Sequence, residues 1–210
     1  MALVSWKSAR ITAAGLGLLE PGRWLDDEVM NFWIQYYTTT DPPDGLGDRE
    51  DVLIMDPSVV SWILYELTSC KEPDLEDVQD ALESCDFHKK QRVLIPLSDR
   101  QDKGGDGYKG VHWALLALER HGEEVQGHYY DSMGSGNLHQ AQLLASKLCS
   151  ARVSVAPAGK QQNACDCGVF TLLFAEALSR GENPKDITQA QADEARNRMA
   201  SKIRSLARPS

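Results

Sequence analysis

Residues 161–181 read QQNACDCGVFTLLFAEALSRG. The apolar spacing after the second cysteine, closed by Gly181, predicts a buried helix that begins at Cys167. A cysteine attacks a carbonyl as thiolate, and the positive end of a helix dipole stabilises that anion. Gly168 leaves room for a substrate carbonyl, and the local backbone amides face the developing oxyanion. The pattern favours Cys167 as a nucleophile, although a buried core cysteine is the ordinary alternative.

The cysteine pattern also bears on metals and redox state. Cys165 and Cys167 form a C-x-C pair, but no second Cys or His pair has the spacing of a zinc site, so no metal is expected. A disulfide between them would be strained, although Cys165 could trap an oxidised Cys167 if the fold lets the sulfurs meet. Five cysteines at irregular spacings do not suggest a secreted disulfide framework. Reduced thiols and a cytoplasmic or nuclear location are expected.

Two apolar runs upstream predict a β-hairpin that supplies a base. Residues 111–119 read VHWALLALE and residues 125–131 read VQGHYYD. If the two-residue turn falls at 121–122, His112 faces Asp131 directly across the strands. A carboxylate that orients an imidazole is what activation of a nucleophile requires. A polar pair at the end of a sheet is the alternative, and a one-residue slip would put the two side chains on opposite faces.

A glutamine pair lies in the polar segment before the nucleophile. Gln161 and Gln162 precede Cys167 by six and five residues. Either amide could complete an oxyanion hole, and a solvated turn glutamine is the alternative. The histidines other than His112 lie in loops or lack a facing acid, and they are expected to be solvated.

The whole sequence predicts one α+β domain with a mixed or antiparallel sheet flanked by helices. It divides into a helical part at about 20–90, a sheet and catalytic part at about 91–180 and a C-terminal helix at about 186–206. Acidic residues in the first turn and apolar residues at helical spacing predict a helix over 25–38. Further helices are predicted at 57–69, 74–84 and 137–149, strands at 92–98 and 152–156, and a glycine-rich loop at 99–110.

Composition points to a protein or peptide partner. The 210 residues carry 22 Lys plus Arg against 31 Asp plus Glu, a formal charge of −9. This acidic balance disfavours nucleic acid as a ligand. No run has the length of a membrane span or the core of a signal peptide, so no membrane association is expected. We expect a monomer without a cofactor.

The candidate residues occur in a recognisable order. His112, Asp131, Gln161 and Cys167 lie in GVHWALL, YYDSMGSGN and QQNACDCGVF, and residues 23–37 read RWLDDEVMNFWIQYY. This resembles the ubiquitin-like-protein-specific cysteine proteases, the sentrin and adenain-like group, over nearly the whole chain; papain-like enzymes place the cysteine before the histidine. The resemblance implies that Cys167 is the nucleophile, His112 the general base, Asp131 its orienting partner and Gln161 the oxyanion-hole amide.

The resemblance also implies a substrate groove. Trp24 and Trp113 would cover a narrow tunnel for a Gly-Gly tail, and Asp27 would bind the extended peptide just before that tail. Ordinary core packing is the alternative for both tryptophans. Position 26 is Asp where the family often has Asn, a departure that bears on the preferred modifier.

Within this family the chain looks most like the deneddylase, with the SUMO-specific members next. The likeness lies in LLEPGRWLDD, KKQRVLIPLSD, DSMGSGN and the loop 99–110, which resembles a segment that closes over substrate in the deneddylase. The implied activity is a thiol protease that cleaves after the C-terminal Gly-Gly of a Nedd-type modifier, in deconjugation or precursor processing. The alternatives are a SUMO-specific protease, an acetyltransferase or a non-catalytic modifier-binding module on the same fold.

Overall fold

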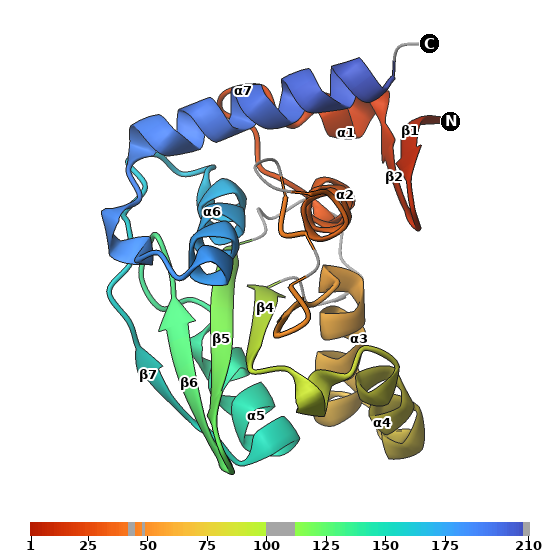
Figure 1. Cartoon of the computed structure of the whole chain (residues 1–210), viewed down its shortest axis with the longest axis vertical. Coiled ribbons are helices and arrows are strands. Elements are labelled where there is room, and N and C mark those ends of the chain that lie inside the picture. The colour runs from red at the N-terminus through yellow and green to blue at the C-terminus, as the bar shows by residue number, and fades with distance from the viewer. Residues whose placement is uncertain (42–44, 48, 100–111, 208–210) are drawn as a thin grey trace.

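The computed structural model describes residues 1–41, 45–47, 49–99 and 112–207. Its centre is a five-stranded sheet (Figure 1), whose strands in spatial order are β3 (Val52–Ile54), β4 (Arg92–Ser98), β5 (Trp113–His121), β6 (Glu124–Tyr130) and β7 (Arg152–Val155). Strands β4, β5 and β6 are antiparallel neighbours, while β3 and β7 join the two edges in parallel. The sheet is mixed, and the predicted α+β class is confirmed.

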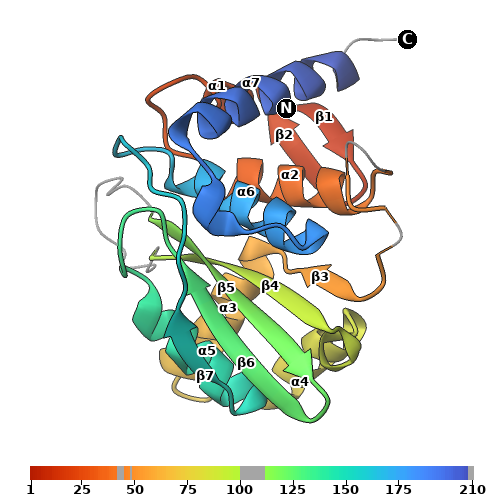
Figure 2. The same ribbon diagram turned by 60° about the vertical axis from the view of Figure 1, so that its left-hand side comes forward.

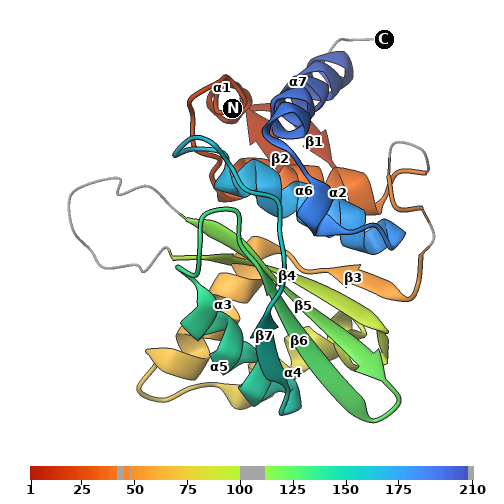
Figure 3. The same cartoon turned by 90° about the vertical axis from the view of Figure 1, so that its left-hand side faces the viewer.

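One face of the sheet carries the helices nearest to the candidate site. These are α2 (Asp27–Thr38) and α6 (Cys167–Arg180), and α7 (Gln189–Leu206) packs across them on the outside (Figure 3). The N-terminal hairpin of β1 (Ala2–Trp6) and β2 (Ala9–Thr12), followed by α1 (Ala13–Gly17), lies beside α2 (Figure 2). Segments from both ends of the chain therefore meet on this face.

The opposite face is covered by α3 (Pro57–Thr68), α4 (Leu75–Ser84) and α5 (Leu138–Cys149), as Figure 3 shows. Short 3₁₀ turns occur at Phe87–Lys89 and Pro184–Asp186. The helices between residues 20 and 90 are thus divided between the two faces of the sheet. The reason is that β3 follows α2 and carries the chain across the edge of the sheet.

Local sequence fixes the ends of the helices around the site. The Asp26 carboxylate caps α2 by accepting a backbone N–H of the first turn. Helix α7 starts slightly later than the predicted 186, because Thr188 and Gln191 form a capping box. Helix α6 ends at Gly181, whose φ of +78° is the left-handed conformation that glycine adopts without strain.

Strand β5 belongs to two hydrophobic cores at once, because successive side chains of a strand point to opposite faces. Leu115 and Ala117 pack with residues of α2 and α6, whereas Leu116 and Leu118 pack with residues of α3, α4 and α5. All four side chains are fully buried. Truncating one such leucine to alanine costs about 2–5 kcal/mol, so the strand is held firmly from both sides.

The predicted β5–β6 turn is wrong by one position. His121 pairs with Glu124, so the turn consists of residues 122–123 instead of 121–122. Gly122 has a φ of +67°. The first central residue of a tight hairpin turn takes a positive φ, which glycine adopts readily and histidine does not.

This correction changes how the two candidate catalytic residues meet. The ladder runs to the Leu115–Tyr130 pair, so the register is shifted by two residues from the predicted one. A two-residue shift keeps every side chain on its original face, whereas a one-residue shift would not. His112 and Asp131 therefore remain on one face, as diagonal neighbours instead of directly opposed ones.

Some elements were not predicted. Strands β1, β2 and β3 and helix α1 contain five residues or fewer each, too few for periodicity to reveal them. The loop predicted at 99–110 lies, apart from Asp99, outside the described residues. Within the described ranges, no helix combines the length and apolar character that crossing a bilayer needs.

Candidate active site

His112 and Asp131 lie at the open end of the β5–β6 hairpin, just before β5 and just after β6. The His112 Nε2 atom is 2.9 Å from Asp131 Oδ2. The same imidazole is hydrogen-bonded to the side chain of Cys167. Three side chains far apart in sequence thus form a continuous chain of carboxylate, imidazole and sulfur.

The two neighbours of the imidazole keep it protonated. Hydrogen bonds to Asp131 and then to Cys167 raise the pKa of His112 from 6.5 to about 10, although burial opposes the charge. At neutral pH the ring is an imidazolium. A cation beside the sulfur stabilises the thiolate, which is the form of cysteine that attacks a carbonyl.

Asp131 is buried, and burial alone would raise its pKa. Hydrogen bonds from His112, from the Met133 N–H, from the Tyr129 hydroxyl and from the Gly134 N–H outweigh burial and hold the pKa of Asp131 well below its usual range. The Met133 and Gly134 amides donate to Oδ1 at 2.7 and 3.0 Å, and Tyr129 donates to Oδ2 at 2.7 Å. The carboxylate is therefore ionised and fixed in direction.

Two further residues hold the imidazole in place. The buried Asn137 donates its side-chain amide to the carbonyls of His112 (2.9 Å) and Leu97 (3.2 Å), and its backbone N–H to the Tyr129 hydroxyl (3.0 Å). A Cβ atom at Gly136 would lie 2.9 Å from His112 Cδ2. Glycine at this position lets the loop pass close to the ring.

Cys167 is the first residue of α6 and is 3% exposed. Asp166 holds the N-cap position, but its carboxylate makes no capping bond to the helix. It accepts hydrogen bonds from Asn163, Gln189 and Arg196 instead. The first-turn N–H groups of α6 are thus left without a carboxylate cap beside the sulfur, where they can stabilise an oxyanion.

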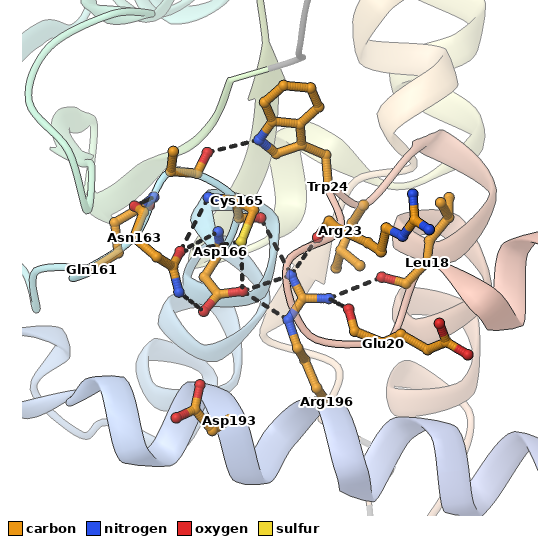
Figure 4. A network of polar contacts seen from close by, with 12 residues as sticks. Leu18, Glu20, Arg23, Trp24, Gln161, Asn163, Cys165, Asp166, Asp193 and Arg196 are labelled. Atoms are coloured by element: carbon orange, nitrogen blue, oxygen red, sulfur yellow. Dashed lines mark hydrogen bonds and ion pairs between the residues drawn. The ribbon is translucent and has the colours of Figure 1, made fainter.

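A cavity of about 400 Å³ opens at these residues. It is lined by Trp24 and Ala164, by residues 133–136, and by His112 and Cys167. The Trp24 indole is 47% exposed and donates to the Ala164 carbonyl at 2.7 Å (Figure 4). An indole facing mainly small side chains suits an extended chain without bulky side chains of its own.

Gln161 is engaged in local hydrogen bonds and is not among the residues that line this cavity. Its Oε1 accepts the Ser132 hydroxyl, and its Nε2 donates to the Asn163 carbonyl, both at 2.6 Å. An amide has two N–H donors, and the bond to Asn163 uses one. The oxyanion role of Gln161 stays a prediction. Gln162 is bonded through its backbone N–H to Gln189.

Trp113 and Asp27 also lie outside the cavity lining, unlike Trp24. Trp113 is 1% exposed and donates to the Leu25 carbonyl at 3.0 Å. A Cβ atom at Gly168 would lie 3.2 Å from its ring, so the indole packs beneath the start of α6. Asp27 is the first residue of α2. The tunnel role of Trp113 and the peptide-binding role of Asp27 stay predictions.

Cys165, the other cysteine of the C-x-C pair, bonds to side chains of its own loop. All five cysteines are free. The Cys165 thiol is buried and donates to Asn163 Oδ1 at 3.4 Å. In the part of the chain that the structure describes, no group of three or more His, Cys, Asp or Glu side chains is placed to hold a metal ion.

Sequence reasoning missed five polar residues around the site: Tyr129, Asn137, Asn163, Asp166 and Arg196. One local signal existed, because an Asp followed by Ser-Met-Gly favours an Asx turn, in which the carboxylate accepts N–H groups two and three residues on. Arg196 had no such signal, since its contacts on the N-terminal segment lie 173 to 178 residues away.

A model of the Ulp1 protease family, C-terminal catalytic domain, matches residues 23–208. The chain belongs to the Ulp1 protease family. Members of the family are cysteine peptidases, and the candidate triad of His112, Asp131 and Cys167 falls within the matched range. The chain is therefore a cysteine-type peptidase, and the resemblance predicted from its motifs is confirmed.

Individual relatives agree with this membership. The chain is similar to sentrin-specific protease 8 of Rattus norvegicus, with 26% identity over 84% of this chain and 78% of that protein. It is 25% identical to the probable sentrin-specific protease 8 of Dictyostelium discoideum, over 84% of this chain and 74% of that protein. The solved C-terminal Ulp1 protease domain, in complex with Smt3, the yeast orthologue of SUMO, has a TM-score of 0.71 at 17% identity, covering 99% of this chain and 88% of that one. The last likeness concerns the family fold alone.

Proposed function

We propose that this peptidase cleaves after the C-terminal Gly-Gly of a ubiquitin-like modifier, from a lysine conjugate or from a precursor. The observation that carries the proposal is the carboxylate, imidazole and sulfur chain at a cavity lined by Trp24, Ala164 and residues 133–136. The small side chains of this lining leave room for a glycine tail, and larger side chains would meet the indole.

Each residue then has a defined step. The Cys167 thiolate attacks the terminal glycine carbonyl, and the oxyanion forms beside the first-turn N–H groups of α6. The His112 imidazolium gives its proton to the leaving amine, which leaves a thioester on Cys167. Neutral His112 next takes a proton from water, whose attack releases the modifier and the sulfur. Asp131 holds the ring in position throughout.

The Nedd-type modifier is the preferred substrate in this proposal. It is supported by the likeness of LLEPGRWLDD, KKQRVLIPLSD and DSMGSGN to the deneddylase, and by relatives that bear the name sentrin-specific protease 8. SUMO is the second candidate, because the Ulp1 domain with the same fold was solved with the yeast SUMO orthologue bound. We further propose a monomer that works in the cytoplasm or nucleus and does not bind nucleic acid, in keeping with reduced cysteines and a charge of −9.

Turnover of a modifier with a C-terminal fluorogenic amide tests the reaction. The wild-type protein should release the fluorophore, and Cys167→Ala should abolish release while still binding the modifier, as measured by fluorescence polarisation. Cys149→Ala, at the end of α5, is the matched control and should keep the wild-type rate. Unchanged turnover in Cys167→Ala would exclude this residue as the nucleophile.

A panel of electrophilic probes built on ubiquitin, SUMO and the Nedd-type modifier tests the substrate. We expect Cys167 to react fastest with the Nedd-type probe. Faster reaction with SUMO would favour the second candidate, and binding without reaction would indicate a non-catalytic module. Transfer of acetyl from acetyl-coenzyme A to a protein would indicate an acetyltransferase.

A further inference from the structure

A buried arginine outside the triad joins segments from three parts of the chain (Figure 4). Arg196 lies on α7 and is 3% exposed. Its guanidinium donates to four backbone carbonyls and to the carboxylate of Asp166. A buried charge is costly unless it is paired and fully hydrogen-bonded. This many hydrogen bonds therefore indicate that the Arg196 guanidinium is held in one fixed position.

One set of bonds fixes the backbone that leads to the cavity indole. Arg196 donates to the carbonyl of Leu18 at 2.9 Å, of Glu20 at 3.4 Å and of Arg23 at 2.6 Å. The next residue is Trp24, which lines the cavity. Arg196 thus holds the backbone segment that carries the Trp24 indole.

A second set fixes the backbone that leads to the nucleophile. The guanidinium lies 2.6 Å from Asp166 Oδ1 and donates to the Cys165 carbonyl at 3.3 Å. Asp166 directly precedes Cys167. The arginine also neutralises this carboxylate, whose uncompensated charge would oppose a thiolate on the next residue.

Other bonds close the arrangement around the arginine. The second Asp166 oxygen accepts the side-chain amides of Asn163 at 2.7 Å and Gln189 at 2.6 Å. The Trp24 indole donates to Ala164, in the same loop as Asn163, at 2.7 Å. The indole-bearing and nucleophile-bearing segments are therefore connected both directly and through α7.

We propose that Arg196 is a positioning residue that sets the placement of Trp24 relative to Cys167, and so aligns the bound modifier tail with the sulfur. This inference rests on the proposed function for its substrate. Arg196 is not among the residues that line the cavity, and its hydrogen bonds go to the two segments that carry Trp24 and Cys167. A displacement of about 1 Å at a reacting carbonyl lowers the rate about 10²-fold.

The role requires arginine in particular. A guanidinium is a planar fork with five N–H donors, which lets one side chain reach carbonyls and a carboxylate in different directions. A lysine ammonium is a single point with three donors. Arg196→Lys keeps the charge that pairs with Asp166 but cannot hold both segments at once.

The test compares Arg196→Lys with Arg198→Lys, the same substitution two residues further along the same helix. Arg198 pairs with Glu176 at 2.8 Å and contacts neither segment of the cavity in the described structure. A double variant, Asp166→Asn/Arg196→Met, removes both buried charges together. Such replacements are often neutral for stability, so this variant keeps the test valid if the single variant does not fold.

Three measurements are made at a temperature where circular dichroism shows every variant folded. Kinetics with the fluorogenic modifier amide give kcat and KM. Alkylation of Cys167 by iodoacetamide, followed by mass spectrometry, measures the reactivity of the sulfur in the triad and does not depend on how the modifier tail is aligned. Hydrogen exchange of residues 18–24 and 163–167 reports the two segments without needing any substrate.

We expect both Arg196 variants to lose at least about 10-fold in kcat, with KM changed less, Cys167 alkylation within about 2-fold of wild type, and faster exchange in both segments. Arg198→Lys should match wild type in all three. Unchanged kcat and exchange in the Arg196 variants, or equal losses in Arg198→Lys, would overturn the inference. If wild type acts on no modifier, the proposed function fails, and hydrogen exchange alone then decides whether Arg196 holds the two segments.

Discussion

His112 faces two partners that favour the same charge on its ring. Asp131 and the Cys167 side chain each stabilise the imidazolium by a hydrogen bond. The raised pKa of His112 means that the proton on the ring is retained until the pH approaches about 10. Its contribution to folding stability is fully present below pH 6.5 and is lost as the pH rises through about 10.

The raised pKa of His112 also predicts how catalysis depends on pH. We expect kcat/KM for the modifier amide to fall at alkaline pH, with a limb near 10, because the proton needed by the leaving amine is then lost. Asp131→Asn removes the largest cause of the raised pKa, so the limb should move to lower pH while the rate falls about 10²–10⁴-fold. An unchanged limb in the variant would show that another group sets it. Circular dichroism verifies that the variant is folded.

Gly136 offers a test of ring placement without removing any catalytic group. Gly136→Ala would put Cβ 2.9 Å from His112 Cδ2, closer than packing allows, so the ring must move. We expect kcat to fall about 10–100-fold with a smaller change in KM, because the ring no longer aligns with the sulfur. Gly17→Ala is the control, since nothing lies within 4 Å of its added Cβ. Wild-type kcat in Gly136→Ala would contradict the tight contact.

Residue-level prediction from sequence was possible where chemistry restricts the choice of residue. The nucleophile, base and carboxylate could be proposed because their order and local settings are distinctive. The buried Arg196 could not, because the polar composition of its helix predicts a solvated face, and its partners become neighbours only after the chain has folded. Gln161 and Trp113 match the family motifs but do not line the cavity, so their roles stay predictions.

At the scale of elements, the N-cap residue of α2, Asp26, makes the stability of the protein depend on pH. Burial, followed by the nearby Glu28 and Asp27 charges, raises the pKa of Asp26 despite its capping bond to Val29. A raised carboxyl pKa means that the fold favours the protonated form, so the stability that Asp26 confers declines as the pH rises above 3.8. Asparagine caps a helix about as well as aspartate and carries no charge.

Asp26→Asn should therefore be more stable than wild type at pH 7. The gain should vanish near pH 3, where the wild-type carboxyl is protonated. Asp26→Ala is the control that loses the cap: it should cost about 1 kcal/mol near pH 3 and less at pH 7, where it also removes the buried charge. Thermal melts at the two pH values decide between these outcomes, and a destabilised Asp26→Asn at pH 7 would contradict the assigned pKa direction.

Element prediction was accurate for long amphipathic segments and weak for short ones. Helices α2, α3, α4, α5 and α6 and strand β4 lie close to their predicted bounds because ten or more residues, or a strongly apolar run, define them. Strand β3 has three residues, and its pairing with β4 is a tertiary event. The hairpin register depended on one backbone angle, at Gly122, that periodicity does not encode.

At the scale of the whole molecule, the site draws on segments from both ends of the chain and on the sheet between them. Trp24 comes from the N-terminal segment, Asp131 from the hairpin and Cys167 from α6, while α7 connects the first and last of these through Arg196. Both hydrophobic cores share β5, the strand that follows His112. Loss of either core should therefore disturb the triad.

Leu144→Ala tests this coupling from the far side of the sheet. Leu144 lies on α5, is 1% exposed and belongs to the core opposite α6. We expect a loss of about 2–5 kcal/mol, which lowers the thermal midpoint by roughly 4–20 °C. Because β5 joins the cores, the midpoint from far-UV circular dichroism should coincide with that from loss of Cys167 turnover, in the variant and in wild type. Two separate midpoints would mean that the face carrying α6 unfolds independently of the face carrying α5.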